Sequence, residues 1–180
     1  MADKFFEQKA LLDRVYSAIE SSAIVGQGEN SIVYRITNHI VAKVYNPEVD
    51  KHLIENEYEI GLMLKEHGFS VPEIYGLEDF EDLGWVSFME KITGKSLLRA
   101  SIKTRVFVDY LVKQELNKAR KLGFVPSKIK SSDVIYNYDI ENDKPFKITL
   151  IDFMEWRYEA PRPKFPNWFP RLTALMQNEK

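Results

Sequence analysis

Residues 26–46 decide the fold, and they read GQGENSIVYRITNHIVAKVYN. Two apolar runs lie within this stretch, at 32–34 and 40–45, and a third lies just before it, at 23–25. Breaks rich in Gly, Asn and Thr separate the runs, which is typical of short β-strands joined by turns. The stretch therefore predicts a three-stranded antiparallel meander, whose third strand ends at Pro47.

The segments around the meander alternate between helical and strand patterns. Apolar side chains recur at helical spacing, which predicts helices over 4–20, 50–67 and 105–122, the last two stopping at Gly68 and Gly123. Further strands are predicted at 74–77 and 84–89, and 134–136 with 147–151 predict a hairpin around the polar turn 141–144. Prolines keep 159–170 from being regular throughout, and 172–176 predict a last short helix. The predicted fold class is α+β, with a β-rich N-terminal part.

Composition excludes several kinds of function. The 180 residues fit one domain or one compact two-lobed unit. The chain has no cysteine, which excludes disulfides, thiolate metal sites and cysteine nucleophiles. Its net charge of −2 gives no electrostatic reason to expect nucleic acid or an anionic membrane as partner. No apolar run approaches the about 18 residues of a membrane-spanning helix, and the N-terminus lacks the apolar core of a signal peptide, so we expect a cytoplasmic protein.

A pair of glycines, Gly26 and Gly28, falls between the first two predicted strands. Glycines in such a turn allow the backbone to approach phosphate oxygens closely and to present N–H donors to them. The chain has Ser31 where a third glycine of a phosphate-binding loop would stand. An ordinary hairpin turn uses the same residues, so the pair alone does not decide between the two interpretations.

One lysine, Lys43, lies inside the third strand of the meander. Because side chains alternate along a strand, Val41, Lys43 and Tyr45 share one face, and Ile40 and Ala42 point to the other. A lysine at such a position is either an ordinary surface residue or a cation that binds nucleotide phosphates.

The predicted helix over 50–67 carries a carboxylate on its apolar stripe. Leu53, Glu57, Ile60 and Leu64 fall on one side of the helix, so Glu57 is expected to face the core. A buried carboxylate needs a partner, and Lys43 is the natural candidate. The alternative is that Glu57 lies at the edge of the stripe and reaches water.

Taken in order, these residues resemble the protein-kinase superfamily, including its small-molecule and divergent bacterial branches. The resemblance rests on the glycine pair with Val33, on Lys43 and Glu57, on the stretch 71–76, on the stretch 88–97, which resembles a gatekeeper and hinge, and on 150–154 (LIDFM), which resembles the Asp-Phe-Gly segment. It implies one kinase-like unit over 1–180: an N-terminal helix at 1–21, a nucleotide-binding N-lobe at 22–92, a reduced helical C-lobe at 93–158 and a Pro- and aromatic-rich tail at 159–180.

The resemblance also implies roles for individual residues. The residues assigned to ATP are Gly26, Gly28, Ser31, Val33, Val41, Lys43, Glu57, Met89, Glu90 and Ile92. In this assignment the two valines cover the adenine, the backbone of 90–92 binds its edge, and Lys43 paired with Glu57 holds the phosphates. Asp152 binds Mg²⁺, and Asp133, which stands where the family has an asparagine, is its second ligand.

The catalytic loop of the family is not matched. Residues 122–135 keep its apolar frame, but Pro126 stands where the family has a histidine and Lys128 where it has the aspartate that orients the acceptor hydroxyl. Met154 replaces the glycine of the Asp-Phe-Gly segment, and the usual activation segment is missing. The chain therefore departs from the family at the residues that carry out phosphotransfer.

Three functions remain open from the sequence. The first is a pseudokinase-type module that binds ATP and acts through a protein partner. The second is an atypical phosphotransferase that uses Lys43 and takes Asp133 as its base. The third is a structural domain without nucleotide, against which the presence of Lys43, Glu57 and Asp152 argues.

Overall fold

The computed structural model describes residues 2–139 and 144–159. In these residues the protein is α+β, with a five-stranded antiparallel sheet and three α-helices, so the predicted class is confirmed. The described chain forms two compact units, one of residues 2–54 and 74–91, the other of residues 55–73, 92–139 and 144–159. The second α-helix is divided between them.

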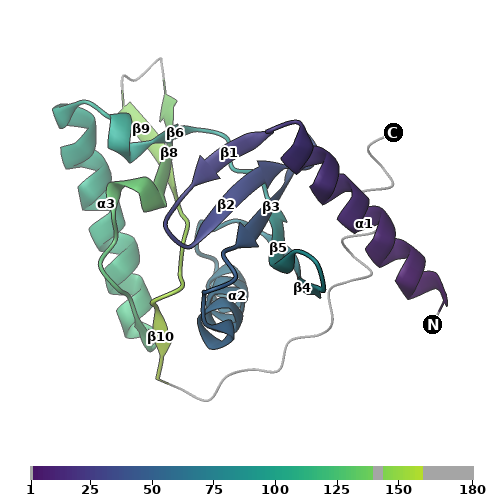
Figure 1. Ribbon diagram of the computed structural model, residues 1–180. Helices are drawn as coiled ribbons and strands as arrows, with labels where there is room; N and C mark the ends of the chain where they lie inside the picture. The colour runs from purple at the N-terminus through teal and green to yellow at the C-terminus, as the bar shows by residue number, and fades with distance from the viewer. Residues whose placement is uncertain (1, 140–143, 160–180) are drawn as a thin grey trace. The chain divides into compact units, whose positions relative to one another are not determined.

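The first unit is a helix followed by a five-stranded sheet (Figure 1). Its elements are α1 (Ala2–Glu20), β1 (Ile24–Gln27), β2 (Ser31–Arg35), β3 (Ile40–Tyr45), β4 (Ile74–Phe80) and β5 (Gly84–Glu90). The strand order is β1-β2-β3-β5-β4, and every neighbouring pair is antiparallel. The predicted meander and the two further strands are confirmed. The pairing of β3 with β5, which are separated in the sequence by α2 and β4, was not predicted.

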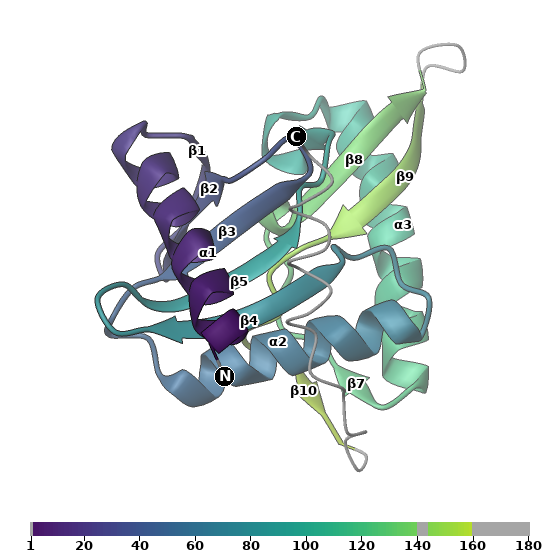
Figure 2. The ribbon, with the colours of Figure 1, turned by 90° about the vertical axis from the view of Figure 1, so that its right-hand side faces the viewer.

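The core of this unit lies between α1 and one face of the sheet. Leu11 and Val15 of α1 belong to the same buried cluster as Ile40, Ala42 and Phe88 from β3 and β5, and Figure 2 shows α1 lying across the strands. Val15, Ala42 and Phe88 have no exposed surface. Fully burying a side chain such as Val15 or Phe88 stabilises a fold by about 1.5–3 kcal/mol, so α1 is a structural part of the unit.

The second unit combines most of α2 (Lys51–Glu66) with α3 (Ile102–Lys121) and two small sheets. One sheet has the order β6-β8-β9 and the other pairs β10 with β7. Their strands are β6 (Lys95–Ser96), β7 (Phe124–Val125), β8 (Val134–Asp139), β9 (Lys144–Leu150) and β10 (Arg157–Tyr158). Two 3₁₀ turns complete it, η1 (Leu97–Arg99) and η2 (Ser131–Asp133). The β8–β9 hairpin lies alongside α3 (Figure 2).

The helices over 50–67 and 105–122 and the hairpin of 134–136 with 147–151 are thus confirmed. One expected core position is wrong, because Leu53 is 43% exposed. It lies in the first turn of α2, where Ile54 is the buried residue, and the helix becomes buried on several sides only from Ile60 to Leu64. The irregular stretch 159–170 falls almost wholly outside the described residues, and the helix over 172–176 does so entirely. None of the helices in the described part of the chain is long and apolar enough to cross a membrane.

Candidate functional site

Strand register brings four of the expected site residues to one face of the five-stranded sheet. Gly26 pairs with Val33, and Val33 pairs with Lys43. Val41, two residues before Lys43, pairs with Met89. Residues opposite each other, or two apart on one strand, project to the same face. We call Val33, Val41, Lys43 and Met89 the lysine face, which is the side of the sheet opposite the α1 core.

Lys43 is buried on this face, with 7% of its surface exposed. Its ammonium nitrogen lies 5.1 Å from the centre of the Tyr45 ring, two residues along the same strand. The structure therefore excludes an ordinary surface lysine at this position. A buried ammonium is stabilised by an aromatic face and by nearby negative charge, and it is a strong binding group for anions.

The glycine pair lies in a well-fastened turn. The Gly28 N–H donates to the carbonyl of Ser31 at 2.9 Å, and the Asn46 side chain donates to the carbonyl of Glu29 at 2.6 Å. Neither Gly26 nor Gly28 has a left-handed φ. A methyl group at Gly26 would meet Val33 at 3.7 Å, and one at Gly28 would have its nearest neighbour, the Ser31 carbonyl, at 3.9 Å. These are ordinary contacts, so the fold itself does not require glycine at either position.

The expected hinge begins where β5 ends, at Glu90. Met89 and Glu90 are half-buried, and so is Ile92, the first residue of the second unit after β5. The N–H of Lys91 donates to the carbonyl of His39 at 2.7 Å. That bond removes the Lys91 N–H from the donors that the segment 90–92 offers to a ligand.

In the second unit, Asp133 is a buried carboxylate that ends η2, and 8% of it is exposed. Its Oδ2 accepts the backbone N–H of Lys130 and its Oδ1 accepts the Ser132 hydroxyl, both at 2.7 Å. The carbonyl of Asp133 accepts the N–H of Ile151 at 2.8 Å. Because Ile151 precedes Asp152, this bond holds the backbone of Asp133 next to the backbone that leads into Asp152.

The electrostatic state of Asp133 reflects this setting. Burial raises the pKa of the Asp133 carboxyl above its ordinary value of 3.8, and the charge of Asp152 raises it further, whereas the hydrogen bonds from Ser132 and Lys130 act in the opposite direction. The charge of Asp152 thus acts on the Asp133 carboxyl, and we call Asp133 and Asp152 the aspartate pair. A divalent cation held by both carboxylates would offset their like charge.

The backbone at Asp152 is strained. Its φ is +70°, and Ser22 is the other non-glycine residue with a positive φ in the described chain. Asp152 is exposed, while Phe153 and Met154, which follow it, are buried. Residues held in this conformation cluster at functional sites, because the surrounding structure must maintain them against a cost of about 1–3 kcal/mol.

Glu57 of α2 is buried in the same unit, with 5% of its surface exposed. Its Oε1 accepts the N–H of Phe153 at 3.4 Å. The expected inward position of Glu57 is therefore confirmed, and the alternative that it reaches water is wrong. Lys43 belongs to the first unit and Glu57 to the second, and the ion pair between them stays a prediction.

Sequence reasoning missed the role of Asn56. Its side-chain amide donates to the carbonyls of Met154 at 3.1 Å and Trp156 at 2.7 Å, so it fastens the segment after Asp152 to α2. An asparagine on a helix usually indicates a solvated position, and nothing in the pattern around Asn56 distinguishes it from one.

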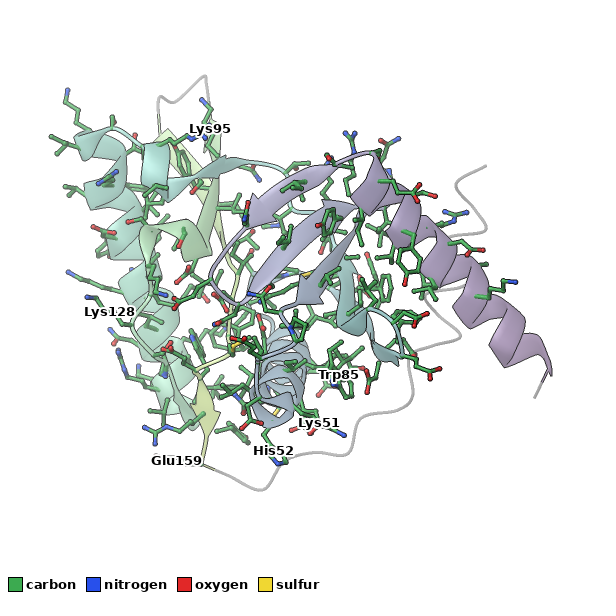
Figure 3. The ribbon with its side chains drawn as sticks, in the orientation of Figure 1. Lys51, His52, Trp85, Lys95, Lys128 and Glu159 are labelled. Carbon is green, nitrogen blue, oxygen red and sulfur yellow. The ribbon has the colours of Figure 1, made fainter. Side chains whose placement is uncertain are left out.

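The loop before the aspartate pair keeps its apolar frame and lacks a carboxylate at the expected catalytic position. Phe124 and Val134, on either side of the loop, each have 1% of their surface exposed. Pro126 is half-buried, and Lys128 is exposed (Figure 3). The described residues hold no group of three or more His, Asp or Glu side chains that could bind a metal ion by themselves. The aspartate pair alone matches the requirement of Mg²⁺, which usually takes one or two carboxylates together with substrate phosphates and water.

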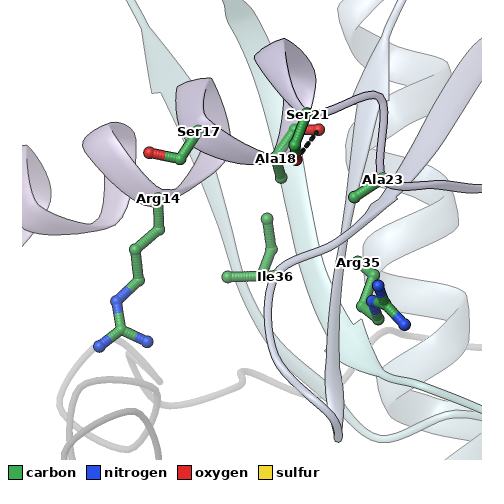
Figure 4. A pocket seen from close by; sticks show the side chains of 7 residues that line it. All are labelled: Arg14, Ser17, Ala18, Ser21, Ala23, Arg35 and Ile36. Carbon is green, nitrogen blue, oxygen red and sulfur yellow. Dashed lines mark hydrogen bonds between the residues drawn. The ribbon is translucent and has the colours of Figure 1, made fainter.

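A separate pocket of about 370 Å³ lies in the first unit, between the end of α1 and the end of β2 (Figure 4). It is lined by Arg14, Ser17, Ala18, Ser21, Ala23, Arg35 and Ile36, none of them an expected site residue. The two arginines would favour an anion. However, the carbonyl end of α1 disfavours one, and the hydroxyls of Ser17 and Ser21 already donate to carbonyls of that helix.

We compared the sequence with models of known protein families and with curated proteins, and neither comparison finds a significant match.

Proposed function

We propose that the protein is a kinase-like module that binds a magnesium–nucleotide complex, with ATP as the expected nucleotide, and transfers its phosphate very slowly or not at all. The observation that carries this proposal is the aspartate pair: a buried Asp133, an exposed Asp152 with a strained backbone, and the hydrogen bond that holds them to neighbouring positions. The protein-kinase fold, of which the α+β class is the coarser description, is part of the same proposal.

The aspartate pair fits Mg²⁺ in number and in chemistry. Each oxygen of Asp133 accepts one hydrogen bond and keeps further lone pairs for a cation. Bound Mg²⁺ would neutralise phosphate charge and orient the phosphates. Residues of the chain position the two carboxylates. The bonds from Lys130 and Ser132 hold the carboxylate of Asp133 in one orientation, and Glu57 and Asn56 hold the backbone that follows Asp152.

The lysine face of the first unit, taken by itself, has groups that suit a nucleotide. A buried ammonium at Lys43 suits an anionic ligand, and Val33, Val41 and Met89 offer apolar surface beside it for a flat base. The glycine pair adds a further argument. Neither the backbone conformation nor the packing requires glycine at 26 or 28, and close approach of phosphate to the backbone is a function that would require it.

Slow or absent transfer follows from the loop residues. A positioned base or acceptor-orienting carboxylate contributes about 10²–10⁴-fold to a rate, and the position expected to hold it has Lys128. A charged lysine cannot accept a hydroxyl proton. It can instead neutralise phosphate, which suits binding better than transfer.

A second candidate function is an atypical phosphotransferase, and one observation favours it. A carboxyl whose pKa is raised by burial, as at Asp133, is better suited to take a proton near neutral pH than an ordinary aspartate. The two functions use the same residues and differ in turnover. A third possibility, a structural domain without nucleotide, predicts no response to nucleotide at all.

Thermal unfolding with ATP, with and without Mg²⁺, tests the proposal. Ligand at about 100 times its Kd adds about 2.7 kcal/mol of stability, which in a chain of this size raises Tm by roughly 5–10 °C. We expect this rise with Mg²⁺ present and a smaller one without it. Asp152→Asn should abolish the difference, whereas the exposed Asp109→Asn serves as a matched control and should leave it intact. A Tm unchanged by nucleotide would favour the structural domain.

Phosphate release under the same conditions separates the first two functions. We expect no turnover above the rate of the Asp133→Asn variant. Robust turnover that Asp133→Asn and Asp152→Asn abolish and Lys128→Ala leaves unchanged would instead establish a phosphotransferase that uses Asp133.

A further inference from the structure

Helix α3 presents apolar side chains on two opposite sides. Val108, Val112 and Ala119 are buried, and the helix packs against β7 and β9. On the opposite side, Ile102, Val106 and Tyr110 follow one another at intervals of four residues, which places them in one row. Their side chains are 82%, 67% and 58% exposed, so α3 carries an apolar row that its own unit does not cover.

Two further residues widen this row into a surface. Phe107 lies beside it on α3, and Leu98 of η1 is 61% exposed just before the helix. The Arg105 side chain donates to the carbonyl of Leu98 at 2.7 Å, which ties η1 to the first turn of α3. We call Leu98, Ile102, Val106, Phe107 and Tyr110 the α3 patch. A contiguous apolar surface of this kind usually marks a binding site, because scattered single residues are the norm elsewhere.

The charge around the α3 patch restricts the partner. Helix α3 has six basic and two acidic residues, although the whole chain carries a net charge of −2. Arg99, Lys103 and Lys113 are exposed beside the patch, and within residues 2–139 and 144–159 none of their side chains takes part in a hydrogen bond or ion pair. Asp109 also lies on this side of α3, so the patch is an apolar strip whose border is mainly basic, in a protein that is otherwise acidic.

We propose that the α3 patch binds an acidic amphipathic segment of a partner protein. The apolar side chains of that segment would cover Ile102, Val106 and Tyr110, and its carboxylates would face Lys103 and Lys113. This pattern matches charge-complementary recognition, in which apolar side chains give affinity and charges select the partner. The inference concerns the second unit alone and does not depend on nucleotide binding.

Two other occupants fit the patch less well. A second copy of the chain, related by two-fold symmetry, would bring Arg99, Lys103 and Lys113 towards the same residues of the other copy, and like charges repel. A membrane surface is usually bound by helices rich in Trp, Phe and Leu that can sink into the headgroups, whereas one side of α3 is held by the unit and its free side includes Asp109.

A designed peptide tests the proposal directly. The probe is a fluorescent peptide of about 15 residues with Leu at every fourth position and Glu on its flanks. A scrambled peptide of the same composition and a version with Lys in place of Glu serve as controls, and binding is read by fluorescence polarisation at low and high salt. We expect the acidic peptide to bind more tightly than both controls, and to lose affinity as salt rises.

Paired variants then locate the binding surface. Ile102→Ser with Val106→Ser removes two of the three side chains of the apolar row, and Lys103→Glu with Lys113→Glu reverses two charges of the border. Each pair should weaken the acidic peptide by about tenfold or more, and the charge-reversed pair should bind the Lys peptide instead. Leu53→Ser, at another exposed leucine, is the matched control and should change nothing. Far-UV circular dichroism checks that each variant is folded.

Three results would overturn the proposal. One is an acidic peptide that binds no better than its scrambled form. Another is sedimentation of the protein with vesicles containing phosphatidylserine that the two serine substitutions abolish, which would make the patch a membrane surface. The third is a concentration-dependent dimer in analytical ultracentrifugation that the same substitutions dissociate, which would assign the patch to a second copy.

Discussion

Replacing Gly28 with alanine separates the needs of the fold from those of a ligand. The added methyl group would have its nearest neighbour at 3.9 Å, and the backbone is not left-handed there. Alanine is then compatible with the folded state and reduces the entropy of the unfolded chain, which stabilises proteins by about 0.4–1 kcal/mol. At about 2–4 °C per kcal/mol, Tm should rise by roughly 1–4 °C.

Nucleotide binding should change in the opposite direction. If phosphate approaches the backbone at Gly28, a methyl group there weakens a hydrogen bond to a charged group, and such bonds contribute about 1.5–3 kcal/mol. The Kd for the magnesium–nucleotide complex should then rise by about ten- to a hundredfold. Urea unfolding gives the stability, and isothermal titration calorimetry gives the Kd.

Gly94→Ala is the matched control. Gly94 has φ +149°, and a methyl group there would lie 2.7 Å from the side chain of Ile135 and 2.8 Å from the carbonyl of Tyr136. Overpacking of this kind costs about 1–3 kcal/mol, so this variant should lose stability. The reasoning about Gly28 would be refuted if Gly28→Ala were destabilised as much as Gly94→Ala, or if it kept both its stability and its full affinity for nucleotide.

Three further predictions concern the second unit. Asp152→Asn should remove the Mg²⁺ dependence of nucleotide binding and leave the fold intact, as calorimetry with and without the metal would reveal. The raised pKa of Asp133 means that the folded state holds this proton to higher pH than the unfolded chain, so stability should fall as pH rises from 3.8 through the raised pKa, by at most about 1.4 kcal/mol per pH unit. Urea unfolding across that range should give a flatter profile for Asp133→Asn; identical profiles would contradict the assignment. Lys128→Asp should not produce phosphotransfer, because one carboxylate does not change the other positions at which the chain departs from the expected catalytic pattern, and phosphate release above background would show otherwise.

Local sequence patterns predicted the helices and strands, and they also predicted which side chains of β3 share a face of the sheet. The alternation that places Lys43 opposite Ile40 and Ala42 depends only on the geometry of a strand, which is why it could be predicted from 40–45 alone. The inward position of Glu57 followed in the same way from helical spacing. These inferences needed no knowledge of distant residues.

What depends on distant contacts could not be predicted. The pairing of β3 with β5, the burial of Asp133 and the clamp by Asn56 each join residues far apart in the chain, and a local pattern does not carry that information. The close approach of 135–137 to Gly94 is a further contact between distant parts of the chain. The apolar row of α3 was not predicted either, because Ile102 lies before the expected helix over 105–122 and because exposure depends on how the helix packs against β7 and β9.

The two bonds from Asn56 have a consequence for control. A loop that switches between two conformations must be able to leave each of them at a small cost in free energy. Here, leaving the observed conformation would break both bonds from Asn56, which hold the carbonyls of Met154 and Trp156. It would also expose the Trp156 side chain, which is fully buried and packs edge-on against Phe153 at 5.4 Å. The segment that follows Asp152 is thus held firmly in one conformation. Rearrangement of this segment would therefore cost the molecule several packed and hydrogen-bonded contacts at once.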